Sequence, residues 1–221
     1  MSHSYYPIAL DLSGKPCLLV GGGVIADGKL DALLAAGARL TVVSPDVSPR
    51  IAAFAAEGRI TLHRRHYASG DVSGMFLVIA ATDDRAANAR VAADGRAVGA
   101  LVNAVDDIPN CDFFAVALVR RGDLQIAIST NGRSPAFARW MRERLDASVT
   151  VEYGELLDIL GTVRQELKER GPIPVYEHWQ AAITDDVIAA LGAGDRETAT
   201  ARIYERVSAG VGTVAADEAA R

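Results

Sequence analysis

The stretch Val20-Gly21-Gly22-Gly23-Val24-Ile25-Ala26 decides the fold, because it matches the pattern Gly-x-Gly-x-x-Ala between an apolar run and a helical pattern. The apolar run, residues 16–20, is typical of a strand buried on both faces, and apolar residues recur at helical spacing from 25 to 34. In such a strand–turn–helix unit the glycines let the backbone approach a pyrophosphate, which the helix N-terminus then binds. The alternative is a tight turn with no ligand. The residues expected to bind a dinucleotide here are Gly21, Gly22, Gly23, Val24 and Ile25.

Strands and helices alternate over the rest of the first half of the chain. Further strands are predicted at residues 40–43, 60–62, 75–81 and 101–103. Helices are predicted between them, at residues 47–57 and 84–96. Because a parallel sheet needs such crossovers, this order predicts an α/β fold, a Rossmann-type doubly wound parallel sheet, over residues 1–112.

The pattern changes after Asp106. Residues 113–119 and 124–128 predict two strands joined by a hairpin turn, and Ser134-Pro135 predicts the start of a helix. These apolar strands lie outside the parallel sheet, and their edges need a partner, so we expect a C2 homodimer. We expect a β-containing dimerisation segment over residues 113–149 and a small C-terminal helical domain over residues 150–221. Within the latter, helices are predicted at 153–170, 185–191 and 196–207, with a disordered tail at 209–221; Trp140 and Trp179 are expected in the core.

The choice of nucleotide depends on the end of the second strand, where NAD-binding domains usually carry Asp or Glu. Here Ser44 and Pro45 stand at that position, with Asp46 next, and Ser44 can hydrogen-bond a ribose. Arg50 or Arg64 would instead meet the 2′-phosphate of NADP. Because no basic residue stands directly at the strand end, we expect NAD, and NADP remains the alternative. The residues expected to complete the cofactor site at the carboxyl ends of the strands are Ser44, Pro45, Thr82 and Asn103; helix capping is the alternative for Asp83 and Asp84.

Composition limits the classes of partner. The 221 residues carry a net charge of -5, which does not favour nucleic-acid or membrane-surface binding. No apolar run approaches the roughly 20 residues of a membrane span, and residues 1–7 do not resemble a signal peptide, so a cytoplasmic location is expected. Cys17 is expected in the core; Cys111 and Asp112 have no histidine nearby in sequence, so no metal site is predicted.

Two further motifs carry a family resemblance, namely Asn103-Ala104-Val105-Asp106-Asp107 and Ser129-Thr130-Asn131-Gly132-Arg133-Ser134-Pro135. Together with the glycine turn, and in this order over about residues 5 to 170, they resemble the precorrin-2 dehydrogenase and sirohydrochlorin ferrochelatase family, including the corresponding part of sirohaem synthase. Asn131 stands where the family often has glycine; asparagine tolerates the left-handed conformation that such a turn needs.

The resemblance implies NAD-dependent oxidation of precorrin-2 to sirohydrochlorin, with Asp106 as the catalytic residue. It leaves open whether the protein also inserts Fe2+ or Co2+ into the product, and it implies a homodimer. Methylation of the precursor is expected to come from another protein. The tetrapyrrole substrate carries many carboxylates, which suit arginine. The residues expected to bind it are Ser129, Thr130, Arg133 and Ser134.

One rival function comes from a different class. A dinucleotide-sensing regulatory module without catalysis would share the glycine turn. It would not need Asp106 or the stretch of residues 129–135.

Overall fold

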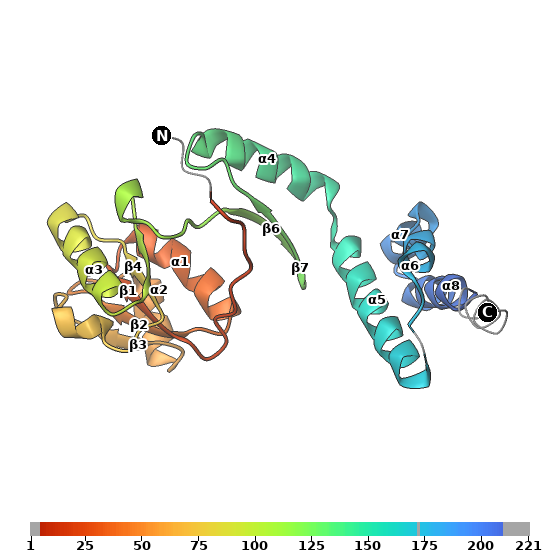
Figure 1. The fold of residues 1–221 in the computed structure, drawn as a ribbon, viewed down its shortest axis with the longest axis horizontal. Helices are drawn as coiled ribbons and strands as arrows, with labels where there is room; N and C mark the ends of the chain where they lie inside the picture. The colour runs from red at the N-terminus through yellow and green to blue at the C-terminus, as the bar shows by residue number, and fades with distance from the viewer. Residues whose placement is uncertain (1–4, 172, 210–221) are drawn as a thin grey trace, which may run out of the picture. The chain divides into compact units, whose positions relative to one another are not determined.

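The computed structural model describes residues 5–171 and 173–209. They form two compact units, one ending at Ala115 and the other beginning at Val116, each with its own core (Figure 1). The predicted disordered tail, apart from residue 209, lies outside the described residues.

The first unit is built on a five-stranded parallel sheet in the order β3-β2-β1-β4-β5. Its strands are β1 Pro16–Val20, β2 Arg39–Val43, β3 Thr61–His63, β4 Leu77–Ala80 and β5 Leu101–Ala104. The chain moves outward from β1 through β2 to β3, then returns to place β4 on the other side of β1. The predicted Rossmann-type sheet is confirmed, and its switch point lies between β1 and β4, where ligands bind in folds of this kind.

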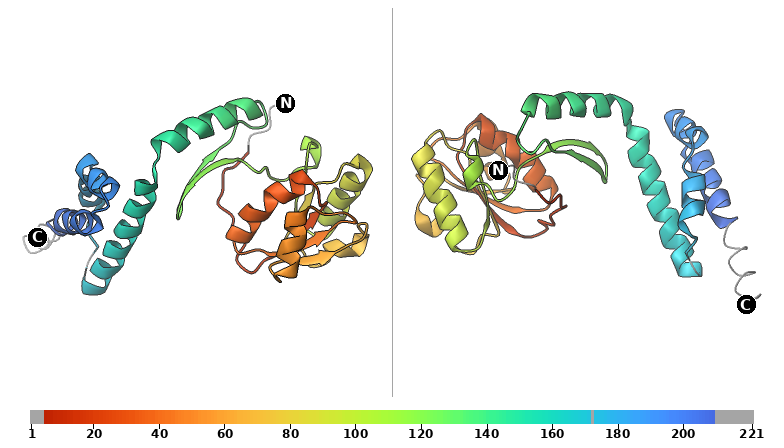
Figure 2. Two further views of the ribbon diagram at one scale, coloured as in Figure 1. Left: turned by 180° about the vertical axis from the view of Figure 1, so that it is seen from behind. Right: turned by 45° about the horizontal axis from the view of Figure 1, so that its top comes forward.

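Helices cover both faces of this sheet (Figures 1 and 2). They are α1 Val24–Ala35, α2 Pro49–Ala56 and α3 Arg85–Ala97, with short 3-10 helices at Ser69–Val72 (η1) and Ile108–Asn110 (η2). Because side chains alternate along a strand, Cys17 and Leu19 of β1 pack in one core with α1 and α2, while Leu18 and Val20 pack in another with α3. Cys17 is fully buried, as expected.

The second unit begins with an antiparallel hairpin, β6 Ala117–Arg121 and β7 Leu124–Ile128. Five helices follow: α4 Pro135–Ser148, α5 Val151–Arg170, α6 Tyr176–Ala182, α7 Asp185–Gly192 and α8 Arg196–Ser208. Ser134 caps α4 by accepting a hydrogen bond from the Phe137 amide, and Pro135 occupies the first turn, as predicted. Helices α5 to α8 share one apolar core, and Figure 2 shows α6, α7 and α8 gathered beside α5.

Three local predictions are wrong. The strand expected from residue 113 begins only at Ala117, because the chain just before it lies along β5 instead: Cys111 forms a bridge with Asn103, whose amide donates to the Phe113 carbonyl. Helix α6 was not predicted, since it is short and follows a Gly-Pro-Ile-Pro break. Trp140 was expected in the core but is 48% exposed on α4, a helix with no buried residue.

Candidate active site

A cleft of about 1250 Å³ opens at the carboxyl ends of β1, β2 and β4. Every residue predicted to bind the cofactor lines it except Asn103: Gly21, Gly22, Gly23, Val24, Ile25, Ser44, Pro45 and Thr82. The cleft is closed on its other sides by the chain after β3 and by the first turns of α3, including His66, Tyr67 and Arg90. The predicted residues from three separate loops therefore meet at the switch point of the sheet.

The three glycines of the turn have different structural requirements. A Cβ on Gly21, whose φ is 121°, would lie 2.3 Å from the carbonyl oxygen of Ala81, and one on Gly22 would lie 2.1 Å from that of Asp46. A Cβ on Gly23 would meet nothing within 4 Å. The first two glycines thus pack the turn against neighbouring backbone, whereas Gly23 leaves its side of the turn open to the cleft.

The start of α1 suits an anionic group. Gly23 is its N-cap, no side chain caps it, and Val24 and Ile25 are exposed. The first amides of an α-helix have no partner within the helix, and the helix dipole adds partial positive charge there. A pyrophosphate bound over Gly23 would accept hydrogen bonds from these amides. The turn and the helix together therefore fit a dinucleotide.

The end of β2 presents oxygen atoms to the cleft. Ser44 is buried, and its hydroxyl donates to the Asp46 carbonyl at 2.6 Å, which leaves its lone pairs to accept from a ribose hydroxyl. The side chain of Asp46 is exposed. Arg50 is hydrogen-bonded to the side chain of Asp31 and the carbonyl of Asp27 instead. Neither Arg50 nor Arg64 lines the cleft.

A buried amide that the sequence analysis did not single out holds the loop after β4. Asn88 of α3 accepts hydrogen bonds from the Thr82 amide at 3.1 Å and the Thr82 hydroxyl at 2.7 Å, and its own amide donates to the Thr82 carbonyl at 2.8 Å. The available signal was a polar residue on the otherwise apolar face of a helix. Asp84 caps α3 by accepting from the amides of Ala86 and Ala87, which confirms the capping alternative for that residue.

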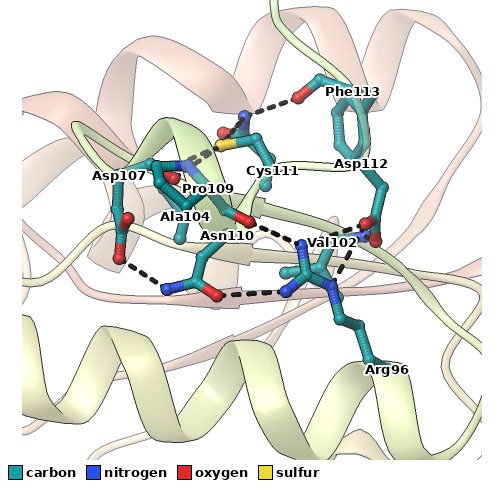
Figure 3. Close-up of polar contacts among 10 residues, drawn as sticks. Arg96, Val102, Ala104, Asp107, Pro109, Asn110, Cys111, Asp112 and Phe113 are labelled. Carbon is teal, nitrogen blue, oxygen red and sulfur yellow. Dashed lines mark hydrogen bonds and ion pairs between the residues drawn. The ribbon is translucent and has the colours of Figure 1, made fainter. Parts of the chain in front are cut away.

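Asp106 lies in a turn directly after β5, with a φ of 59° that non-glycine residues seldom adopt. Its side chain is exposed and has no hydrogen bond or ion pair with any of residues 5–171 and 173–209. Asp107 differs, because its carboxylate accepts from the Asn110 amide at 2.7 Å (Figure 3). Of the two neighbouring acids, Asp106 is therefore the one whose carboxylate is free to act on a ligand.

Asn103 stabilises the loop that follows Asp106. It is buried, and its amide donates to the Phe113 carbonyl at 2.8 Å and to the Cys111 sulfur at 3.4 Å. Burial raises the pKa of the Cys111 thiol, which donates to the Ala104 carbonyl, so this cysteine remains protonated near neutral pH. The structure places the Asn103 side chain in this loop and not in the cleft.

The residues predicted to bind the substrate form the turn between β7 and α4 in the second unit. The Thr130 hydroxyl accepts from the Ser134 amide and donates to its carbonyl, both at 3.3 Å, and the Ser129 hydroxyl accepts from the Asn131 amide at 3.2 Å. Asn131 adopts the expected left-handed conformation, with a φ of 52°. The Arg133 side chain is exposed, with no partner in the described part of the chain.

Among residues 5–171 and 173–209, no three His, Cys, Asp or Glu side chains are grouped so as to hold a metal ion. Among the same residues, no helix is long and apolar enough to cross a membrane.

Comparison with known proteins gives matches along most of the chain. A family model described as putative NAD(P)-binding matches residues 8–117, and one described as sirohaem biosynthesis protein central matches residues 121–148. A siroheme synthase of Chromobacterium violaceum is 37% identical over 208 residues, covering 93% of this chain and 44% of that protein. One of Methylococcus capsulatus is 40% identical over 170 residues, covering 77% of this chain and 36% of that protein. The chain thus spans less than half the length of these relatives.

A solved structure matches over nearly the whole chain. It is that of SirC, a precorrin-2 dehydrogenase, with a TM-score of 0.74, 29% sequence identity, and coverage of 91% of this chain and 100% of that one. The match includes the parallel sheet, the small antiparallel sheet and the helical region. With two adjoining domain models and relatives of this kind, the chain belongs to the family of sirohaem biosynthesis proteins that carry an NAD(P)-binding domain followed by the sirohaem central domain.

Proposed function

We propose that this protein is an NAD-dependent precorrin-2 dehydrogenase, which oxidises precorrin-2 to sirohydrochlorin in sirohaem or related tetrapyrrole synthesis. The observation that carries the proposal is the free Asp106 carboxylate at the same carboxyl edge of the sheet as the glycine turn. The activity named for the SirC relative supports the same reaction. A module that only senses a dinucleotide would have no use for a strained, unpartnered acid at this edge.

The reaction removes two hydrogens from the macrocycle, one as a hydride and one as a proton. The residues of the glycine turn would hold NAD+, which when bound would supply the hydride acceptor of the reaction. Asp106 either accepts the proton as a general base or holds the macrocycle through a pyrrole N–H. The second role would also suit metal insertion into the product, with Fe2+ as a second substrate.

The cleft favours NAD over NADP. Ser44 and the exposed Asp46 provide hydrogen-bond acceptors for ribose hydroxyls, whereas a 2′-phosphate beside Asp46 would be repelled. Arg50 is already paired with the carboxylate of Asp31. We therefore expect Gly21 to Ile25 with Ser44, Pro45 and Thr82 to bind the cofactor.

The turn of residues 129–135 is the proposed substrate-binding element. Arg133 is exposed and can pair with a substrate carboxylate through its planar guanidinium. Ser129, Thr130 and Ser134 would add hydroxyl and amide groups from the same turn, which the Asn131 conformation shapes.

A homodimer is the proposed assembly, formed through residues 113–149. The β6–β7 hairpin is an isolated two-stranded sheet, which is marginally stable on its own. Helix α4 beside it exposes Phe137 (53%) and Trp140 (48%), whose rings are 5.6 Å apart. Adjacent exposed aromatic rings are typical of the centre of an interface.

A paired assay tests the function. Purified protein is mixed with NAD+ while precorrin-2 is generated in the same vessel, and NADH is followed by absorbance. Appearance of NADH together with sirohydrochlorin supports the proposal; binding of NAD+ without turnover would instead support the sensing module. Addition of Fe2+ or Co2+ to the product, read as a change in the tetrapyrrole spectrum, decides whether metal insertion belongs to the same protein.

A further inference from the structure

Arg96 lies at the end of α3, and its guanidinium spans the loop that follows Asp106 (Figure 3). Its Nη1 donates to the Asn110 side-chain oxygen at 3.0 Å, and its Nη2 donates to the Pro109 carbonyl at 3.3 Å. Its Nε and Nη2 both donate to one carboxylate oxygen of Asp112 at 3.1 Å. One side chain from a helix therefore binds three residues of the loop.

Two of the three loop residues that Arg96 binds, Asn110 and Asp112, make further hydrogen bonds within the loop and to β5. Asn110 donates to the Asp107 carboxylate at 2.7 Å, next in the chain to Asp106. The second Asp112 oxygen accepts from the Val102 amide at 2.9 Å, while the Asp112 amide donates to the Val102 carbonyl at 2.7 Å. The loop is thus attached to β5 at one end and to the turn at the other, with Arg96 between them.

We propose that Arg96 is a positioning residue that holds Asp106 in its productive place, an inference that rests on the proposed function. A φ of 59° at Asp106 is a strained state for an aspartate, and such a state persists only where the surroundings enforce it. The turn's own backbone supplies few bonds, notably Asp107 amide to Ala104 carbonyl at 3.2 Å. The planar fork of Arg96 adds four side-chain hydrogen bonds to those that Asn103 and Cys111 make in this loop. A lysine, with its single ammonium, cannot reproduce that geometry.

The test compares Arg96→Met, which keeps most of the stem, and Arg96→Lys, which keeps the charge near the helix C-terminus. Arg39→Met serves as the control, because the exposed Arg39 side chain has no partner among the described residues. We expect both Arg96 variants to lower kcat about 10-fold to 100-fold, as small misplacements of a reacting group do, while KM for NAD+ and NAD+ binding stay unchanged. The control should match the wild type.

A double-mutant cycle separates positioning from simple stabilisation. In an Asp106→Asn background, Arg96→Met should cause little further loss of kcat, because the carboxylate that it positions is already gone. An equal fold-loss in both backgrounds would show that Arg96 acts on stability alone and would overturn the proposal.

Amide hydrogen exchange of the full chain provides a readout that needs no turnover. In Arg96→Met, the amides of Asp107, Asn110 and Asp112 should exchange faster, while amides of β1 and β4 stay protected. If the wild type makes no NADH but this exchange pattern appears, the proposed function fails and the Arg96 constraint stands. Unchanged exchange at the loop, or an unchanged kcat in an active enzyme, would overturn the assignment of Arg96.

Discussion

The backbone of Gly22 packs directly against the carbonyl of Asp46, so closely that a Cβ on Gly22 would lie 2.1 Å from that oxygen. Gly22 occupies the middle position of the Gly-x-Gly turn, where the sequence pattern allows any residue. In this chain the loop after β2 passes too near to admit a side chain. Gly23, one residue along, has open space instead.

Alanine at Gly22 and at Gly23 should therefore have different effects, the first mainly on stability and the second mainly on NAD+ binding. Gly22→Ala forces the loop after β2 to move and should lower the free energy of unfolding by about 1–3 kcal/mol, as overpacking does. Gly23→Ala should cost stability no more than about 1 kcal/mol, the usual loss for alanine at a helix N-cap. It should raise the Kd for NAD+ at least tenfold, because its methyl group would occupy the place proposed for the pyrophosphate. Thermal unfolding and NAD+ titration measure both, with Gly28→Ala, in open space on α1, as the control. An unchanged Kd in folded Gly23→Ala would show that the dinucleotide binds elsewhere.

Asp106→Asn should lower NADH production about 100-fold to 10,000-fold, the usual loss for a general base, with NAD+ binding preserved. Asparagine is chosen because it tolerates the left-handed backbone, so the variant changes the charge and not the turn. Asp107→Asn is the matched control, since its amide oxygen can still accept from Asn110. Loss of turnover in the control alone would move the catalytic role one residue along the chain. Full activity in both variants would remove it from this motif.

Replacement of both Phe137 and Trp140 by serine should weaken the proposed dimer about 1,000-fold in Kd, since each aromatic residue at an interface centre contributes roughly 2 kcal/mol and the two together roughly 4 kcal/mol. Light scattering should give twice the 23.3 kDa chain mass for the wild type and the chain mass for the double variant. Val98→Ser, which removes an exposed apolar side chain in the first unit, should leave the mass unchanged. A wild type that is monomeric at micromolar concentration would contradict the dimer.

The Asp186 carboxylate of α7 accepts a hydrogen bond from Arg206 of α8. The stability of this helical region should therefore depend on acidic pH. Hydrogen bonds from Arg206 and Thr184 lower the pKa of Asp186 to about 2. A carboxylate whose folded pKa is depressed stabilises the fold above its unfolded pKa of about 3.9, and this contribution is lost as pH falls towards 2. Asp186→Asn should therefore lower the denaturant midpoint at pH 7 and flatten its decline between pH 4 and 2. Asp185→Asn, without those partners, should follow the wild type; equal curves for all three proteins would exclude the linkage.

The sequence predicted the elements that depend on local pattern. The apolar run before Gly21 and the helical spacing after it were sufficient for the strand, the turn and the helix, and Ser134-Pro135 was sufficient for the start of α4. The same local signals placed the residues around the cleft, because the carboxyl ends of neighbouring parallel strands share one edge of a sheet.

Contacts between distant residues were not predictable in the same way. Arg96 meets Asp112 sixteen residues later, and nothing in the sequence between them marks the pair. The apolar Phe113 is typical of the start of a strand. In the structure its carbonyl accepts a hydrogen bond from the Asn103 side chain instead, so the strand does not begin there. The exposure of Trp140 also has no local signal, because an exposed aromatic residue and a core aromatic residue look alike in a single sequence.

The attachment of Asp112 to Val102 has a consequence for solubility. Strand β5 is at the margin of the sheet, where free N–H and C=O groups offer a template for a strand from another molecule. Asp112 covers both outward groups of Val102, the amide with its carboxylate and the carbonyl with its own amide. A negatively charged side chain thus occupies the place where a foreign strand would begin to pair. The loop that follows Asp106 thus shields this margin of the sheet from pairing with another chain.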